Sequence, residues 1–127
     1  MRKTLKIKPI KIKNRLVGEN RPCYIIAEIG SNFDGDINKA KKLIKKAKDA
    51  GADAAKFQSF ETNKILSRNG FEEKVSFQST WKKSVWDTYK NAELPIKWIK
   101  ILNKFAKKCD IQFLSAPYHK EAVDELI

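Results

Sequence analysis

The sequence predicts an α/β protein built on parallel strands. Two short apolar runs, at 24–29 and 54–58, each carry one charged residue near their end, and a longer segment separates them. In that segment, from 37 to 50, apolar residues recur every three or four positions, which is typical of an amphipathic helix. A strand, a helix and a second strand in this order form a βαβ unit, whose strands run parallel.

An N-terminal ribbon is predicted before this unit. Residues 4–17 alternate between apolar and basic side chains, with a turn expected at Lys13-Asn14. Because Pro9 has no amide hydrogen to donate, the first strand of the ribbon is expected to lie at an edge. We therefore expect a ribbon within residues 1–20 and a main domain over residues 21–127.

The first βαβ unit has clear limits and a candidate site. Asp36 is a suitable cap for the helix, and Gly51 can adopt the left-handed conformation that ends it. Parallel strands joined by one helix point the same way, so Glu28 and Lys56 should emerge at the same end of adjacent strands. A carboxylate and an ammonium group placed there indicate a functional site. The alternative is an ion pair with no chemical role.

A long connection, from Ser59 to about Glu93, follows the second strand. Connections of this length are usually functional or contain structure of their own. An amphipathic helix is predicted inside it, because four apolar residues fall on one helical face: Trp81, Val85, Trp86 and Tyr89.

The strand and helix alternation then continues to the last residue. Pro95 is suited to the first turn of a helix, whose buried stripe is Trp98, Ile101, Leu102, Phe105 and Ala106. Residues 111–115 predict a third strand. A final helix carries the apolar positions Ala122, Val123, Leu126 and Ile127.

Three strand and helix repeats predict an incomplete barrel. Three parallel strands leave two open edges, and a (β/α)8 TIM barrel typically has about 250 residues. We therefore expect the first three βα units of such a barrel, with the N-terminal ribbon closing its bottom, in a chain that stops within a helix. The alternative is a complete small three-layer domain.

Composition narrows the range of functions. The net charge of +12 raises the possibility of a polyanionic partner, but only four basic residues are arginines, Arg2, Arg15, Arg21 and Arg68. The lysines fall mainly on the polar faces of predicted helices, which favours solvated surfaces over nucleic-acid binding. No apolar stretch approaches the ~20 residues of a membrane span, and no signal core is present, so a cytoplasmic protein is expected. Cys23 and Cys109 belong to no metal or disulfide pattern and are expected to be buried free thiols.

Several segments resemble one enzyme family. They are Pro22 to Asn32, Gly35-Asp36, Ala50 to Gln58, Ser84 to Pro95 and Phe113 to Tyr118. Together they are similar to the sialic acid synthase (N-acetylneuraminate synthase) family, across almost the whole chain.

This resemblance implies a TIM-barrel fold and a specific reaction. Members condense phosphoenolpyruvate with N-acetylmannosamine or a related N-acetylated amino sugar, giving a nine-carbon keto acid and phosphate. A divalent metal ion, Mn or Mg, is implied, with ligands beyond Ile127, and full-length members are often homodimers. No nucleic-acid or membrane partner is implied.

The resemblance also assigns residues. Lys56 matches the lysine that holds the phosphate of phosphoenolpyruvate, and Glu28 matches the catalytic glutamate near the reacting carbons. Gln58, on the same strand face as Lys56, is assigned to the sugar. Ser115 is assigned to phosphoenolpyruvate, although strand alternation places it and Ala116 on opposite faces.

Three positions differ from the family pattern. The family has an asparagine in the long connection that should fall near Thr80, and no asparagine stands there. Phe33 stands where the family has histidine, and Ala116 stands where it has threonine. The single histidine, His119, is expected at the surface, at the start of the last helix, and not as a metal ligand. The alternatives to a synthase are therefore a truncated, inactive remnant of one, or a small basic module that binds polyanions.

Overall fold

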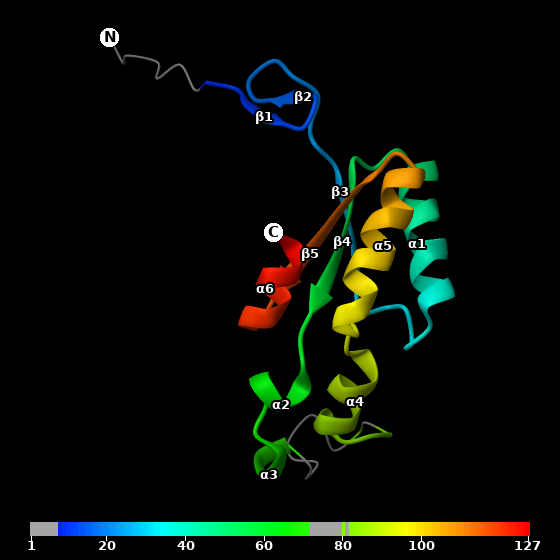
Figure 1. Ribbon diagram of the computed structural model, residues 1–127, viewed down its shortest axis with the longest axis vertical. Coiled ribbons are helices and arrows are strands. Elements are labelled where there is room, and N and C mark those ends of the chain that lie inside the picture. Colours follow the sequence, from blue (N-terminus) through cyan, green and yellow to red (C-terminus); the bar gives the residue numbers. More distant parts are fainter. Residues whose placement is uncertain (1–7, 72–79, 81) are drawn as a thin grey trace.

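The computed structural model describes residues 8–71, 80 and 82–127 (Figure 1). A two-stranded antiparallel ribbon comes first, formed by β1 (Ile10–Ile12) and β2 (Arg15–Val17). The predicted ribbon is thus confirmed, with strands shorter than the range 4–17; residues 4–7 lie outside the described residues.

A three-stranded parallel sheet forms the centre of the molecule. Its strands are β3 (Ile26–Gly30), β4 (Ala54–Ser59) and β5 (Gln112–Pro117), in the order β3-β4-β5. All three were predicted within about two residues of their limits, an accuracy typical of strongly patterned segments. The predicted βαβ connection between β3 and β4 is confirmed.

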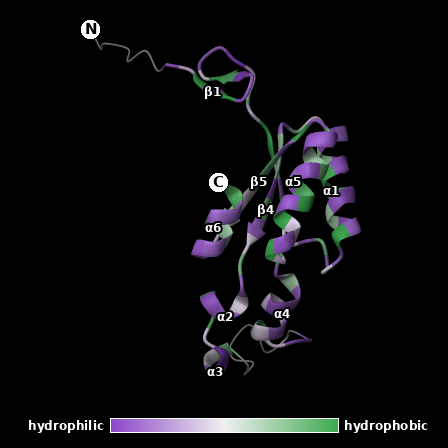
Figure 2. Cartoon of the chain, viewed as in Figure 1, coloured by the Kyte–Doolittle hydropathy of each residue, from purple (hydrophilic) through white to green (hydrophobic). Residues whose placement is uncertain are grey.

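Three helices pack against this sheet: α1 (Ile37–Asp49), α5 (Ile96–Lys108) and α6 (Lys120–Leu126). Asp36 caps α1 as predicted, since its carboxylate accepts a hydrogen bond of 2.7 Å from the Asn38 amide. Gly51 follows α1 with φ +85°, the left-handed conformation expected of it. The helices are apolar towards the sheet and hydrophilic outside (Figure 2).

The long connection contains structure of its own. It holds two single-turn helices, α2 (Thr62–Ile65) and α3 (Arg68–Phe71), and the longer α4 (Val85–Ala92). Helix α4 corresponds to the amphipathic segment predicted there, with Val85 buried; Trp81 lies outside the described residues. The single-turn helices were not predicted, because four residues are too few for a periodic pattern.

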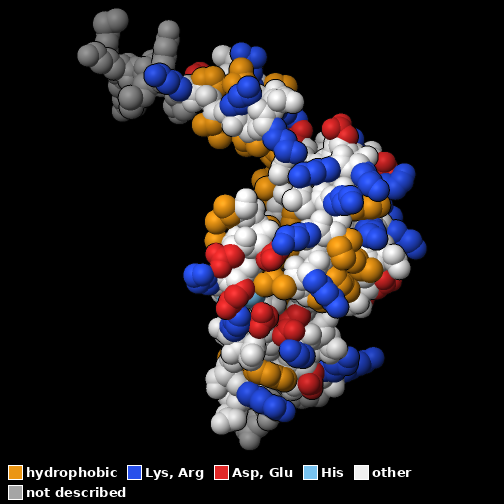
Figure 3. All heavy atoms as spheres, in the orientation of Figure 1, with side chains coloured by type: hydrophobic (Ala, Val, Ile, Leu, Met, Phe, Trp, Pro, Cys, Tyr) orange, Lys and Arg blue, Asp and Glu red, His pale blue; other side chains and the backbone are white. Residues whose placement is uncertain are grey.

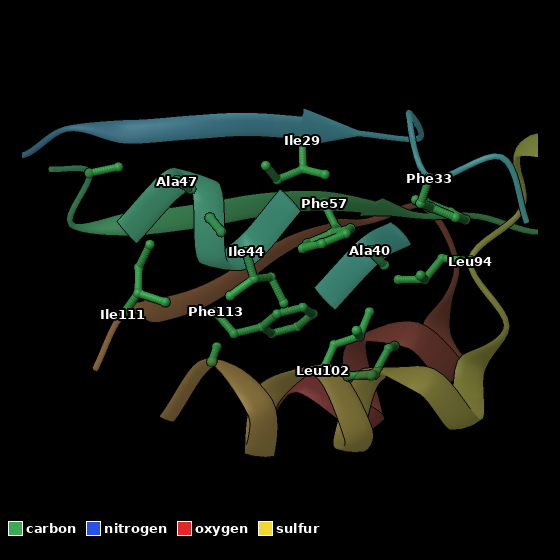
Figure 4. Close-up of a cluster of buried hydrophobic side chains, with 14 residues drawn as sticks. Ile29, Phe33, Ala40, Ile44, Ala47, Phe57, Leu94, Leu102, Ile111 and Phe113 are labelled. Atoms are coloured by element: carbon green, nitrogen blue, oxygen red, sulfur yellow. The ribbon is translucent and has the colours of Figure 1, made fainter. Parts of the chain in front are cut away.

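One face of the sheet carries the hydrophobic core (Figure 4). Ile29, Ala55, Phe57 and Phe113 point from the strands into a cluster completed by residues of α1 and α5. Leu126 of α6 packs against the same cluster. Since strand residues alternate in direction, Glu28, Lys56 and their alternate neighbours lie on the opposite face.

The opposite face is far less covered by the described residues. Ile26, at the start of β3, is 48% exposed, whereas Phe57 in the neighbouring strand is completely buried. Within the described residues, the helices therefore cover only one face of the sheet.

The ribbon is attached at the amino ends of the strands. Arg15 donates to the Asp53 carboxylate and, at 2.9 Å, to the Cys23 carbonyl oxygen, and Asp53 also accepts the Ile25 amide at 2.7 Å. A hollow of about 450 Å³ lies between the ribbon turn and these strand ends. The ribbon therefore lies at the amino ends of the strands, and its role in closing the bottom of a barrel stays a prediction.

The two cysteines are free, but the prediction that they are buried is wrong. Cys23 is exposed and Cys109 is half-buried, because Cys23 lies in the segment leading into β3 and Cys109 at the end of α5. Among the described helices, none combines the length and the apolar character needed to cross a membrane.

Candidate functional site

Glu28 and Lys56 lie directly opposite each other in β3 and β4, each as the third residue of its strand. The strand register pairs the two residues directly, and Lys56 Nζ lies 2.6 Å from Glu28 Oε2. The prediction that they emerge together is confirmed. Both side chains remain open to solvent, with 38% of Lys56 and 50% of Glu28 exposed, so a ligand can reach either group.

A bulge in β3 orients the Glu28 carboxylate. The register between β3 and β4 shifts between Glu28 and Gly30, and Gly30 has φ +56°, a conformation that favours glycine. As a result the Gly30 amide donates a 3.0 Å hydrogen bond to Glu28 Oε1. One carboxylate oxygen is therefore held by the backbone, while the other faces Lys56.

Gln58 lies on the same strand face as Lys56, one alternate position further on. It lines a hollow of about 470 Å³ whose other walls are Phe60, Ile65, Leu66, Tyr89 and Tyr118. Within the described part of the chain, its side-chain amide has no hydrogen-bond partner. The amide is therefore available to a polar group of a ligand that enters this largely apolar hollow.

Ser115 is not brought together with Lys56. In the register Ser115 lies opposite Phe57, and its hydroxyl is 2.6 Å from the Ser59 hydroxyl, on the helix-covered side of the sheet. Ala116, opposite Gln58, occupies the position that faces the site. The structure thus groups Glu28, Lys56 and Gln58, and separates Ser115 from them.

Phe33, which differs from the family pattern, is a core residue. Its side chain is completely buried, with ring centroids 6.2 Å from Phe57 and 6.1 Å from Trp98. The loop after β3 therefore turns back into the core, and this position contributes to packing rather than to the open face.

A charged cluster borders the site at the start of α6. Lys64 of α2 lies 2.8 Å from Glu121 and 3.4 Å from Glu61, and His119 Nδ1 lies 2.9 Å from Glu121. The hydrogen bond from Lys64 is the main reason that the pKa of Glu121 falls to about 2, and the same bond raises the pKa of Lys64. The cluster joins α2 to the end of β5.

His119 corrects one expectation. It caps α6, as its predicted position at the helix start requires, but its side chain is only 7% exposed. The prediction of a surface histidine is therefore wrong, since α2 and the carboxylates of Glu61 and Glu121 enclose the ring. Only the tertiary fold brings these residues together, so no signal in the sequence could have revealed the cluster.

The described residues were also tested for a metal site. Across residues 8–71, 80 and 82–127, no group of three or more His, Cys, Asp or Glu side chains is arranged to hold a metal ion. Glu28 has a lysine, rather than further metal-binding side chains, beside it. The described residues around Glu28 therefore do not fit a metal ion.

The sequence was compared with protein families. The NeuB family profile matches residues 43–127, which is more than half of the chain. The chain belongs to the NeuB family. The match covers β4, which carries Lys56, the long connection and everything that follows.

Relatives of this NeuB chain include two proteins that are named as synthases. The N,N'-diacetyllegionaminic acid synthase of Campylobacter jejuni is 44% identical over 84% of this chain and 32% of the relative. The N-acetylneuraminate-9-phosphate synthase of Mus musculus is 37% identical over 88% of this chain and 31% of the relative. The chain thus spans about one third of the length of these relatives.

A solved structure supports the same assignment. The crystal structure of the N-acetylneuraminic acid synthetase from Leptospira borgpetersenii, in complex with citrate, superposes with a TM-score of 0.76 at 29% identity. The superposition covers 94% of this chain and 37% of that one. The α/β fold with its parallel sheet therefore resembles a sialic acid synthase.

Proposed function

We propose that this chain is the amino-terminal part of the barrel of a nonulosonic acid synthase. Residues 21–127 would supply the first three βα units of a TIM barrel, and residues 1–20 the ribbon at its bottom. Helices on a single face of the sheet and polar side chains on the open face support this arrangement. The activity itself belongs to the whole protein, since the chain spans one third of its relatives.

The proposed reaction joins phosphoenolpyruvate to N-acetylmannosamine or a related N-acetylated amino sugar. The observation that carries this proposal is the ion pair of Glu28 and Lys56, which lie opposite each other on adjacent parallel strands and remain open to solvent. The names of the relatives support the class of product.

In the proposed reaction, C3 of phosphoenolpyruvate forms a bond to the aldehyde carbon of the open-chain sugar, and the aldehyde oxygen becomes a hydroxyl. Water adds at C2, and the resulting tetrahedral intermediate breaks its C2–O bond to release phosphate, leaving the keto group. Lys56 is a compact cation that suits the phosphate. Its half-exposed Nζ can exchange the Glu28 carboxylate for a phosphate oxygen.

Glu28 is proposed to handle the proton of the attacking water. A carboxylate at this position can accept a hydroxyl proton or orient the water. Its hydrogen bond to the Gly30 amide keeps it in place when Lys56 engages phosphate. Catalysis therefore depends on this pair separating when substrate binds.

Gln58 and Ser115 complete the proposed assignments. Gln58 is assigned to the sugar, and this assignment is supported by its unpaired amide at the 470 Å³ hollow. The Ser115 hydroxyl lies against Ser59 on the helix-covered side of the sheet. To contact it directly, phosphoenolpyruvate would have to bind on that side. An indirect role, through the β4 and β5 pairing, agrees better with this geometry.

Substitution of Glu28 tests the proposal. The protein as its cell produces it is incubated with phosphoenolpyruvate and N-acetylmannosamine, and the keto acid and phosphate are measured by mass spectrometry. Glu28→Gln should lower turnover by about 10²–10⁴-fold, whereas the matched change Glu19→Gln, at an exposed ribbon position, should not. Undiminished turnover in Glu28→Gln would remove the catalytic role.

The intact mass of the cellular protein separates the alternatives. A mass two to three times 14.6 kDa would allow a complete barrel. A mass near 14.6 kDa, together with no product from the wild-type protein, would indicate an inactive remnant of a synthase.

A further inference from the structure

A basic groove lies on the outer side of α1 and α5, away from the sheet. It is lined by Lys41, Ile101, Lys104, Phe105 and Lys108 and encloses about 260 Å³. The four residues of α5 are spaced so that they fall on one face of that helix. Lys41 reaches across from α1, with its Nζ 5.8 Å from the centre of the Phe105 ring.

The groove combines exposed apolar surface with uncompensated positive charge. Ile101 is 44% exposed, although it belongs to a helix whose other large apolar residues are largely covered. Lys48 and Lys100, on the same two helices, have carboxylate partners at 3.0 and 3.1 Å, in Asp110 and Glu125. Within the described part of the chain, none of the three groove lysines has such a partner.

The space-filling view shows this arrangement directly. Over α5, apolar surface is bordered by basic side chains (Figure 3). Because α1 and α5 already pack against each other, both walls of the groove are present within the described chain. The groove is separate from the pair of Glu28 and Lys56, which lies on the opposite face of the sheet.

We propose that this basic groove docks an acidic, amphipathic segment of a partner protein. An apolar side chain of the segment would cover Ile101 and Phe105, and its carboxylates would pair with Lys41, Lys104 and Lys108. A helix with acidic and apolar side chains on one face would match both the positive charge and the apolar surface of the groove. The groove contains no arginine, the residue that most often reads base edges.

The test is an NMR titration of the isotopically labelled protein with a synthetic helical peptide rich in glutamate, with leucine at every third or fourth position. Amide shifts should concentrate at the groove residues of α1 and α5. Lys104→Glu combined with Lys108→Glu should weaken binding by about tenfold or more, since like charges would then face each other. Ile101→Ser should weaken it through loss of the apolar contact, with the net charge unchanged.

A matched double variant distinguishes binding in the groove from attraction to the overall positive charge of the protein. Lys42 and Lys46 are exposed on α1, outside the groove, so Lys42→Glu with Lys46→Glu alters the net charge equally. This control should change affinity by less than about twofold at moderate salt, because exposed charges that do not line the groove are largely screened. Thermal unfolding confirms that each variant is folded.

Three results would overturn the proposal. Equal weakening by both double variants would indicate non-specific attraction, and absence of peptide binding would exclude a docking site. Tighter binding to phosphatidylserine vesicles or to an oligonucleotide than to the peptide would replace the protein partner with a lipid or nucleic acid.

Discussion

The two faces of the sheet differ sharply at neighbouring residues of β4. Phe57 is completely buried on the helix-covered face, where its ring lies 5.4 Å from that of Phe113. Lys56, one residue earlier, is 38% exposed on the open face and forms an ion pair with Glu28. The alternation of a strand thus separates packing from ligand chemistry at adjacent positions.

This difference predicts that neighbouring substitutions have unrelated effects. Changes on the helix-covered face should alter the free energy of unfolding. Changes on the open face should alter ligand binding and leave stability nearly unchanged, because exposed ion pairs contribute little.

The largest effect is expected for Phe57→Ala. The substitution leaves a cavity among Phe33, Phe113 and the helices, and truncation of a buried phenylalanine typically costs about 3–5 kcal/mol. Urea unfolding measures this loss. Gln58→Ala, on the open face, is the matched control and should change the unfolding free energy by less than about 0.5 kcal/mol; equal losses would contradict the separation of the two faces.

A smaller loss is expected for Phe33→His. The family pattern has histidine at this position, but here the side chain is enclosed by Phe57 and Trp98. A buried imidazole without a hydrogen-bond partner should lower the unfolding free energy by about 1–3 kcal/mol. Calorimetry at neutral pH would measure the change, and an unchanged melting temperature would show that the loop after β3 does not depend on this packing.

The smallest effect is expected at the charged cluster and depends on pH. Since the pKa of Glu121 is lowered in the folded protein from 4.5 to about 2, its stabilising contact is present above pH 4.5 and is lost as the pH falls towards 2. The pKa of Glu93 is also lowered: burial opposes this shift, but hydrogen bonds from the Thr62 amide and Lys90 outweigh it.

Hydrogen exchange of the α2 amides measures this local effect. The measurements run from pH 5 to pH 2, a range that covers the loss of the Glu121 contact. Glu121→Gln should lower the protection of the α2 amides from exchange at pH 5. It should also flatten the pH dependence of that protection, because the glutamine cannot ionise. Identical profiles in the wild-type protein and the variant would show that Lys64 does not hold α2 through Glu121.

Much of the fold could be predicted because its signals are local. The apolar runs of the strands, the Asp36 cap and Gly51 each depend on a few neighbouring residues. The adjacency of Glu28 and Lys56 followed from a single rule about parallel strands joined by one helix. The structure confirms both the local elements and the adjacency of Glu28 and Lys56.

The remaining features depend on contacts between distant segments. Phe33 is buried because the chain turns back into the core after β3. The His119 side chain is buried because Glu61, which precedes α2, lies across the start of α6. The bulge at Gly30 interrupts the alternation on which strand patterns depend. For Ser115, strand alternation indicated the face on which the structure places it, and its contact with phosphoenolpyruvate stays a prediction.

The most direct test of the account is the binding of phosphoenolpyruvate to the Lys56→Ala variant of the cellular protein. Calorimetric titration should show an affinity weakened by at least about tenfold, while the unfolding free energy stays within about 1 kcal/mol of the wild type. Lys42→Ala, an exposed lysine on α1, is the matched control and should bind like the wild type. Unchanged affinity in Lys56→Ala would contradict the proposed phosphate site on the open face.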